Sequence, residues 1–348
     1  MLVMKRPRRP VAAWPLLFCA VLLCAGFRTV LADAQQPAAQ IAQPLQSSSD
    51  LAIVNLSVLD AKGNFYGGLS RDDFHVFDDG VEKPIVFFSP TDSPARVVIL
   101  METGPAVFLI HDQHLLALSS LLDGLAPDDE AALFAYAESV REVYPFTADK
   151  AALRTSIDES EFTLGMDRLN FYDSLGHVID NLPPGPGKNV IVVLATGLDD
   201  SSESRWDLLE RKLRADNVVV FTVGLGGQLR GDAPQKPAKK QKKKKNQAAD
   251  VGPTPAFARA DEALRSIAQI TGGRAYFPQT PDDFGPAYRE IAATVRHQYV
   301  LGIAPSHDGA FHRLTITVTG IASPQKSKHA AAPAYRLFYR EGYLAPSP

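Results

Sequence analysis

The sequence predicts an α/β protein: a doubly wound, mostly parallel sheet with helices on both faces, plus a β-sandwich-like module built from the flanks of that sheet. Between residues 96 and 295, continuous aliphatic runs alternate with stretches of helical periodicity, as in a parallel sheet covered on both faces. On either side of this region the hydrophobic period is two, which is typical of antiparallel strands. A length of 348 residues, 45% of them hydrophobic, suits roughly two domains of about 150 residues each.

Residues 1–34 are expected to form a signal peptide. Basic residues precede an apolar run over 11–27, and Ala32-Asp33-Ala34 offers the small residues that signal peptidase recognises. We therefore expect a mature chain that begins at Gln35 and resides in the periplasm or outside the cell. The alternative is an uncleaved anchor over 11–31, and only then do we expect membrane attachment.

The net charge restricts the kind of partner that the chain can bind, and the cysteine content restricts how the chain can be stabilised. Without residues 1–34 the chain has 31 basic and 38 acidic residues, a net charge of −7, and no cysteine. The negative charge argues against nucleic-acid binding, so we expect no nucleic-acid partner. Without cysteine, stability in an oxidising compartment must come from the core and not from disulfides.

The segment before the sheet region is expected to hold a disordered linker over 35–50, rich in Gln, Ala, Ser and Pro, and an N-terminal β unit over 51–92. Asp78-Asp79-Gly80 stands between the apolar runs 74–77 and 85–88, and Asp-Gly supplies the positive φ of a hairpin turn. We expect those two runs to pair. A calcium loop would need further acidic ligands, which favours the turn.

The doubly wound domain is expected over 93–296. It contains a long loop at 228–255 whose lysine run, 239–245, predicts disorder because like charges repel. This loop is either a solvated insertion or an electrostatic tether for an acidic partner, a cell-wall polymer or a lipid head group. The candidate strands are 96–101, 131–137, 189–195, 217–223 and 273–277, and the candidate helices are 111–123, 149–158, 170–181, 203–215, 257–271 and 283–295.

The C-terminal strands are expected within 297–346, at 298–304, 311–319 and 335–339. A two-stranded hairpin is marginal by itself, so we expect these strands to pack with the 51–92 unit. The doubly wound domain would then be an insertion in the β module.

Several motifs of this chain resemble those of one protein family and occur in the same order. In chain order they are GLSRDDFHVFDDG (68–80), VVILMETGPA (97–106), LRSIAQITGGRAY (264–276), RHQYVLG (296–302) and YREGY (339–343). With them the chain resembles the VWFA-related (von Willebrand factor type A-like) secreted proteins best known from Acidobacteria. The resemblance implies a von Willebrand factor A (VWA) domain between two β-rich flanks.

In VWA domains the first strand ends in Asp-x-Ser-x-Ser, whose side chains hold Mg²⁺ at the carboxyl edge of the sheet, where ligands of open α/β sheets collect. Compared with the family pattern, the ligand positions here are degenerate. Too few oxygens remain to compete with the hydration of Mg²⁺, so we expect no cofactor and no response of the melting temperature to Mg²⁺, Mn²⁺ or chelator. Glu102 should turn toward solvent or accept backbone N–H groups. The degenerate positions are Glu102, Gly104, Ala106, Leu169 and Thr196, and the possible residual ligands are Glu102, Thr196 and Asp199, with Asp200 beside them.

The resemblance implies an exported, non-enzymatic protein-interaction module that binds an unidentified protein through the loops of the sheet. Phe108, Phe171 and Tyr172 are candidate contacts if they are exposed; burial of Phe171 and Tyr172 is the other interpretation. One alternative is a cation-dependent adhesion domain with an altered site around Glu102, Thr196 and Asp199. A second is a hydrolase that uses the same carboxylates, although no serine has the glycine-flanked turn of such enzymes.

Overall fold

The structure is a computed structural model that describes residues 51–60, 62–108, 111–160, 162, 168–183, 185–227, 255–319, 321 and 335–348. The expected signal peptide, the linker and all but the last residue of the 228–255 loop lie outside this range. Among the described residues, none of the helices combines the length and the apolar character that crossing a bilayer requires.

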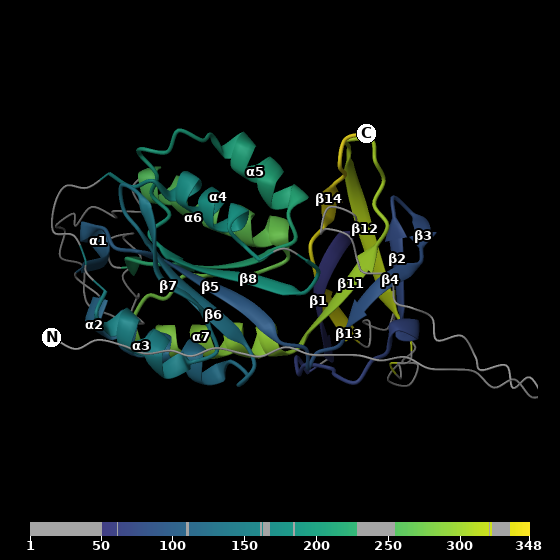
Figure 1. Ribbon diagram of the computed structural model, residues 1–348, viewed down its shortest axis with the longest axis horizontal. Coiled ribbons are helices and arrows are strands. Elements are labelled where there is room, and N and C mark those ends of the chain that lie inside the picture. Colours follow the sequence, from purple (N-terminus) through teal and green to yellow (C-terminus); the bar gives the residue numbers. More distant parts are fainter. Residues whose placement is uncertain are drawn as a thin grey trace, which may run out of the picture. The chain divides into compact units, whose positions relative to one another are not determined.

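A six-stranded sheet forms the centre of the doubly wound domain (Figure 1). The strands are parallel except for the edge strand β7, which runs antiparallel to β6. Their order is β10 (Ala275–Tyr276), β9 (Val219–Gly224), β8 (Lys188–Ala195), β5 (Ala95–Glu102), β6 (Glu130–Tyr136) and β7 (Val140–Thr147).

Helices cover both faces of this sheet, and successive residues of a strand point to opposite faces. In β5, Val97, Ile99 and Met101 enter one core, whereas Val98 and Leu100 enter the other. Each such side chain contributes about 1.5–3 kcal/mol through burial. One face packs against α4 (Phe171–Asp180), α5 (Trp206–Ala215) and α6 (Pro255–Thr271); the other packs against α2 (His111–Gly124), α3 (Lys150–Asp158) and α7 (Pro281–Arg296). The four-residue α1 (Pro105–Phe108) follows β5.

Two antiparallel four-stranded sheets form the β module, and each combines strands from both flanks. The first has the order β13 (Tyr335–Phe338), β1 (Ala52–Asp60), β11 (Gln298–Ile303), β4 (Ile85–Ser89); the second has β14 (Gly342–Leu344), β12 (Phe311–Val318), β2 (Phe74–Asp78), β3 (Val81–Lys83). The short 3-10 helix η2 (Arg71–Asp73) leads into β2. One hydrophobic core joins the two sheets, with Leu56 and Leu301 from the first facing Val76 and Ile316 from the second. The predicted fold class, including the composite β module, is confirmed.

Two local features of the structure differ from the expectations. Strand β7 was not predicted, because it is an edge strand with mostly half-exposed side chains and an internal proline. The run 74–77 does not pair with 85–88: β2 pairs with β3, whereas β4 crosses to the other sheet and pairs with β11 after Pro84. The turn itself is as expected, with φ of 48° at Asp79 and 83° at Gly80.

Arg340 connects the β module to the doubly wound domain. Its side chain is 4% exposed, and its guanidinium donates to the carbonyl oxygens of Leu213 (3.0 Å), Arg214 (2.6 Å) and Asp216 (2.9 Å) at the end of α5. Its Nε donates to the Gly342 carbonyl at 2.8 Å. The last carbonyls of a helix have no partner within the helix, so this arginine caps α5 from another domain.

Lys188, at the start of β8, should make the free energy of unfolding rise with pH. It is 2% exposed, its ammonium donates to the carbonyls of Thr91 and Ser93 at 2.7 Å each, and burial lowers its pKa to about 8. Above pH 8 the folded chain has released this proton while the unfolded chain keeps it until about pH 10.4, so the unfolded state binds more protons. We expect the free energy of unfolding to rise by about 1 kcal/mol from pH 8 to 9.5, allowing for solvent screening.

Urea denaturation across this pH range measures the effect. In Lys188→Met the rise should disappear, whereas parallel pH profiles for the two proteins would contradict the assignment. The range stops at pH 9.5 because the buried tyrosines, Tyr136 and Tyr288 among them, have raised pKa values and act in the opposite direction at higher pH.

Candidate functional site

Glu102 ends β5 at the carboxyl edge of the sheet, and its side chain is completely buried. Its carboxylate accepts the Thr196 backbone N–H at 2.7 Å and the Thr196 hydroxyl at 2.8 and 3.1 Å. The Tyr136 hydroxyl donates to the same group at 3.1 Å. Of the two expected outcomes for Glu102, exposure to solvent and a hydrogen bond from a loop amide, the structure shows the second.

Tyr136 is a site residue that the sequence analysis missed. It ends β6, the strand parallel to β5, and lies opposite Glu102 in the sheet register. Burial, followed by the charge of Glu102, raises the pKa of Tyr136 well above its usual value. The hydroxyl therefore stays protonated and donates to Glu102. The aligned ends of the two aliphatic runs were a usable signal, because neighbouring parallel strands end at the same edge.

Leu169 occupies the space beside Glu102. A Cβ added to Gly104 would lie 2.9 Å from Leu169 Cδ2 and 3.6 Å from Glu102 Oε1, so the Leu169 methyl group fills the space next to residue 104. Leu169 is itself 7% exposed, and Ala106 is the second residue of α1. Mg²⁺ requires several oxygens in octahedral geometry. A methyl group beside a carboxylate that already accepts internal donors does not fit that ion.

The other acidic residues of this edge hold two loops together. Asp199 Oδ1 accepts the Phe171 N–H at 2.9 Å and the Ser202 hydroxyl at 2.6 Å, and Asp200 Oδ1 accepts the Leu169 N–H at 2.7 Å. Asp173 in turn accepts the N–H groups of residues 203 and 204. The segments 168–173 and 199–204 are thus connected by carboxylate acceptors, and the Ser202 hydroxyl accepts the Asp173 N–H at 3.2 Å.

A small groove lies between α4 and α5, next to these loops. Tyr172 and Leu208 line it, together with Asp173, His177 and Lys212. Tyr172 is half-buried against Trp206, with ring centroids 5.9 Å apart, and Leu208 is 55% exposed. Phe171 is fully buried in the sheet–helix core, as the second interpretation of that residue held. The Phe108 side chain lies outside the described part of the chain.

No protein-family model matches this sequence, and no curated protein matches it. Solved structures are similar to it at low identity. An aerotolerance-related membrane protein from Bacteroides fragilis has 14% identity and a TM-score of 0.44 over 58% of this chain and 98% of that one. A von Willebrand factor type A protein from Catenulispora acidiphila has 13% identity and a TM-score of 0.43 over 87% and 75%.

Proximal thread matrix protein 1 from the mussel byssus, solved with zinc in its MIDAS metal-binding motif, has 12% identity and a TM-score of 0.42, over 59% of this chain and 48% of that one. At these identities and TM-scores the similarity does not extend to function.

Proposed function

We propose that this chain is an exported protein-interaction module, not an enzyme, whose doubly wound domain binds a protein partner without a cation. The observation that carries the proposal is that the Glu102 carboxylate accepts internal hydrogen bonds from Thr196 and Tyr136, with Leu169 packed beside it. In a metal-dependent VWA domain, the cation can complete its shell with a carboxylate of the partner. Here that mode of binding is replaced by contacts from loops that hydrogen bonds already order.

The acidic residues at this edge support binding over catalysis. A general base must be able to reach the proton that it removes. Glu102 is enclosed, whereas Asp199 and Asp200 accept backbone N–H groups that fix the loops. The same arrangement argues against the cation-dependent alternative, because Asp199 already accepts the Phe171 N–H and the Ser202 hydroxyl.

The groove beside Tyr172 and Leu208 is the contact surface that we propose. An exposed leucine next to a half-buried tyrosine combines apolar area with a polar tip, which is typical of the centre of protein interfaces. Pre-ordered loops reduce the conformational entropy lost on binding.

Affinity capture tests the proposal. The purified chain is mixed with an envelope extract of the cells that make it, with Mg²⁺ absent or at millimolar concentration, and bound proteins are identified by mass spectrometry. We expect the same partner in both conditions and its loss in Leu208→Asp, because a charge in an apolar contact is costly. The melting temperature of the chain should not change with Mg²⁺.

Val86→Asp is the matched control, since Val86 is 49% exposed on β4 of the β module. This variant should keep the partner. Capture that requires Mg²⁺ would support the cation-dependent adhesion domain instead, and capture that survives Leu208→Asp would overturn the proposed surface.

A further inference from the structure

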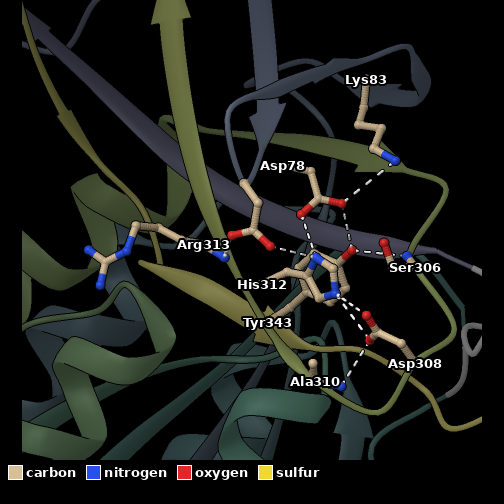
Figure 2. A network of polar contacts seen from close by, with 9 residues as sticks. Asp78, Lys83, Ser306, Asp308, Ala310, His312, Arg313 and Tyr343 are labelled. Atoms are coloured by element: carbon tan, nitrogen blue, oxygen red, sulfur yellow. Dashed lines mark hydrogen bonds and ion pairs between the residues drawn. The ribbon is translucent and has the colours of Figure 1, made fainter.

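The β module contains a polar cluster that none of the sequence motifs predicted (Figure 2). Asp78 ends β2, Asp79 begins the hairpin turn, and His312 lies on β12, the strand paired with β2. His312 Nδ1 is 3.0 Å from Asp78 Oδ1 and 3.0 Å from Asp79 Oδ2. One nitrogen and two carboxylate oxygens from distant parts of the sequence therefore lie within 4.8 Å of one another.

The other ring nitrogen of His312 also faces a carboxylate. His312 Nε2 lies 3.1 and 3.2 Å from the two oxygens of Asp308, which can only accept a proton. In a neutral imidazole with its hydrogen on Nε2, Nδ1 carries a lone pair. Three electron-rich atoms would then meet, and such an arrangement requires a cation between them, either a proton or a metal ion.

In each of the three residues, the polar atom that points away from the cluster has its own hydrogen-bond partner. Each residue therefore offers one atom to a shared ion. Asp78 Oδ2 accepts the Tyr343 hydroxyl at 3.1 Å, and Asp79 Oδ1 accepts the Arg313 N–H at 2.9 Å. His312 Nε2 is held by Asp308. In metal sites, ligating histidines usually donate their second N–H to a carboxylate, and ligating carboxylates are themselves hydrogen-bonded.

Charge favours a divalent ion over a proton. The cluster contains three carboxylates, and the ammonium of Lys83 lies 3.9 Å from Asp78 Oδ2. With a neutral imidazole these groups sum to a charge of −2, which one divalent ion balances and one proton does not. The guanidinium of Arg313 is directed to Glu341, at 2.5 Å, and 67% of its side chain is exposed.

We propose that Asp78, Asp79 and His312 bind a zinc ion, with water in the fourth position. Tetrahedral zinc with bonds of about 2.0–2.1 Å sets neighbouring ligand atoms about 3.3 Å apart, close to the two 3.0 Å separations from Nδ1, and all three ligand atoms lie within 4.8 Å of one another. The imidazole nitrogen and the small number of protein donors favour zinc over Mg²⁺ or Ca²⁺, which require oxygen ligands. The Asp79 side chain is 54% exposed and gives the ion access from solvent.

Titration of the full chain with zinc chloride, followed by calorimetry and by melting temperature, tests the proposal. We expect one strong site, and we expect Asp79→Asn and His312→Gln each to weaken it by at least about tenfold. Asp308 is a positioning residue, and Asp308→Ala should weaken binding by about 10- to 100-fold because it removes only the acceptor of the Nε2–H group. Loading with Co²⁺ gives a second readout, the visible absorption of a low-coordinate ion, which should be lost in His312→Gln.

Asp72→Asn, an exposed aspartate of η2, is the matched control and should leave zinc binding unchanged. Circular dichroism confirms that each variant is folded. Equal zinc affinity in the wild-type chain and in Asp79→Asn would overturn the proposal, as would the absence of a strong site; in either case the cation of this cluster is a proton. Zinc binding here would also make the chain sensitive to chelators, unlike the expectation drawn from the Glu102 site alone.

Discussion

Glu102→Ala should lower the free energy of unfolding by about 4 kcal/mol, the largest effect that we expect at the sheet edge. The substitution leaves the Thr196 N–H, the Thr196 hydroxyl and the Tyr136 hydroxyl without their acceptor in a fully buried site. Each buried donor without a partner costs about 1–3 kcal/mol, and removal of one member of a buried charged group costs about 3–5 kcal/mol. The midpoint and slope of urea denaturation measure the change.

Two further variants make this test specific. Glu102→Gln keeps the shape and one acceptor oxygen, so it should lose roughly half as much stability. Glu138→Ala, an exposed glutamate after β6, should change stability by less than about 0.5 kcal/mol. A loss below about 1 kcal/mol in Glu102→Ala would mean that the carboxylate does not organise the edge, and the proposal of a pre-ordered, cation-free surface would lose its support.

Arg340→Met should lower the free energy of unfolding by about 3 kcal/mol. Methionine fills much of the same volume but supplies no donor, so the carbonyls of Leu213, Arg214 and Asp216 at the end of α5 lose their common partner. Burial lowers the pKa of Arg340 to about 10, so the guanidinium remains charged at neutral pH. A buried charged donor at a helix C-terminus stabilises through both hydrogen bonding and the helix dipole.

Differential scanning calorimetry and urea denaturation measure this loss. Arg340→Lys should recover only part of it, because a single ammonium nitrogen cannot reach four separated carbonyls as the planar guanidinium does. Arg336→Met, at an exposed position of β13, is the control. A full recovery in the lysine variant would show that charge alone matters at this position.

The strands of the central sheet could be predicted because buried parallel strands are continuously apolar. The runs that became β5, β8 and β9 are buried at nearly every position. Strand β7 could not be predicted in this way, since its side chains are half-exposed and Pro145 breaks the pattern. The sequence also did not indicate which sheet β4 joins after Pro84. Tertiary packing decides that β4 pairs with β11.

The candidate site was predictable in its positions but not in its contacts. The sequence alone indicated that Leu169 and Gly104 cannot bind a metal. It did not indicate that Leu169 would pack beside Glu102, or that Tyr136 would donate to it, because both depend on loop geometry and strand register. The cluster of Asp78 and His312 was beyond reach for the same reason, since the two residues are 234 positions apart.

Because β1 pairs with β11, the β module cannot form until both strands are present. Ala52 pairs with Ile303, so roughly 250 residues must be synthesised or translocated before β1 has its neighbour. Until then β1 presents a mostly apolar strand with unsatisfied edges. The module therefore closes last, after the intervening α/β domain can already have folded, and a chain released early would expose an aggregation-prone strand that a holding chaperone must shield.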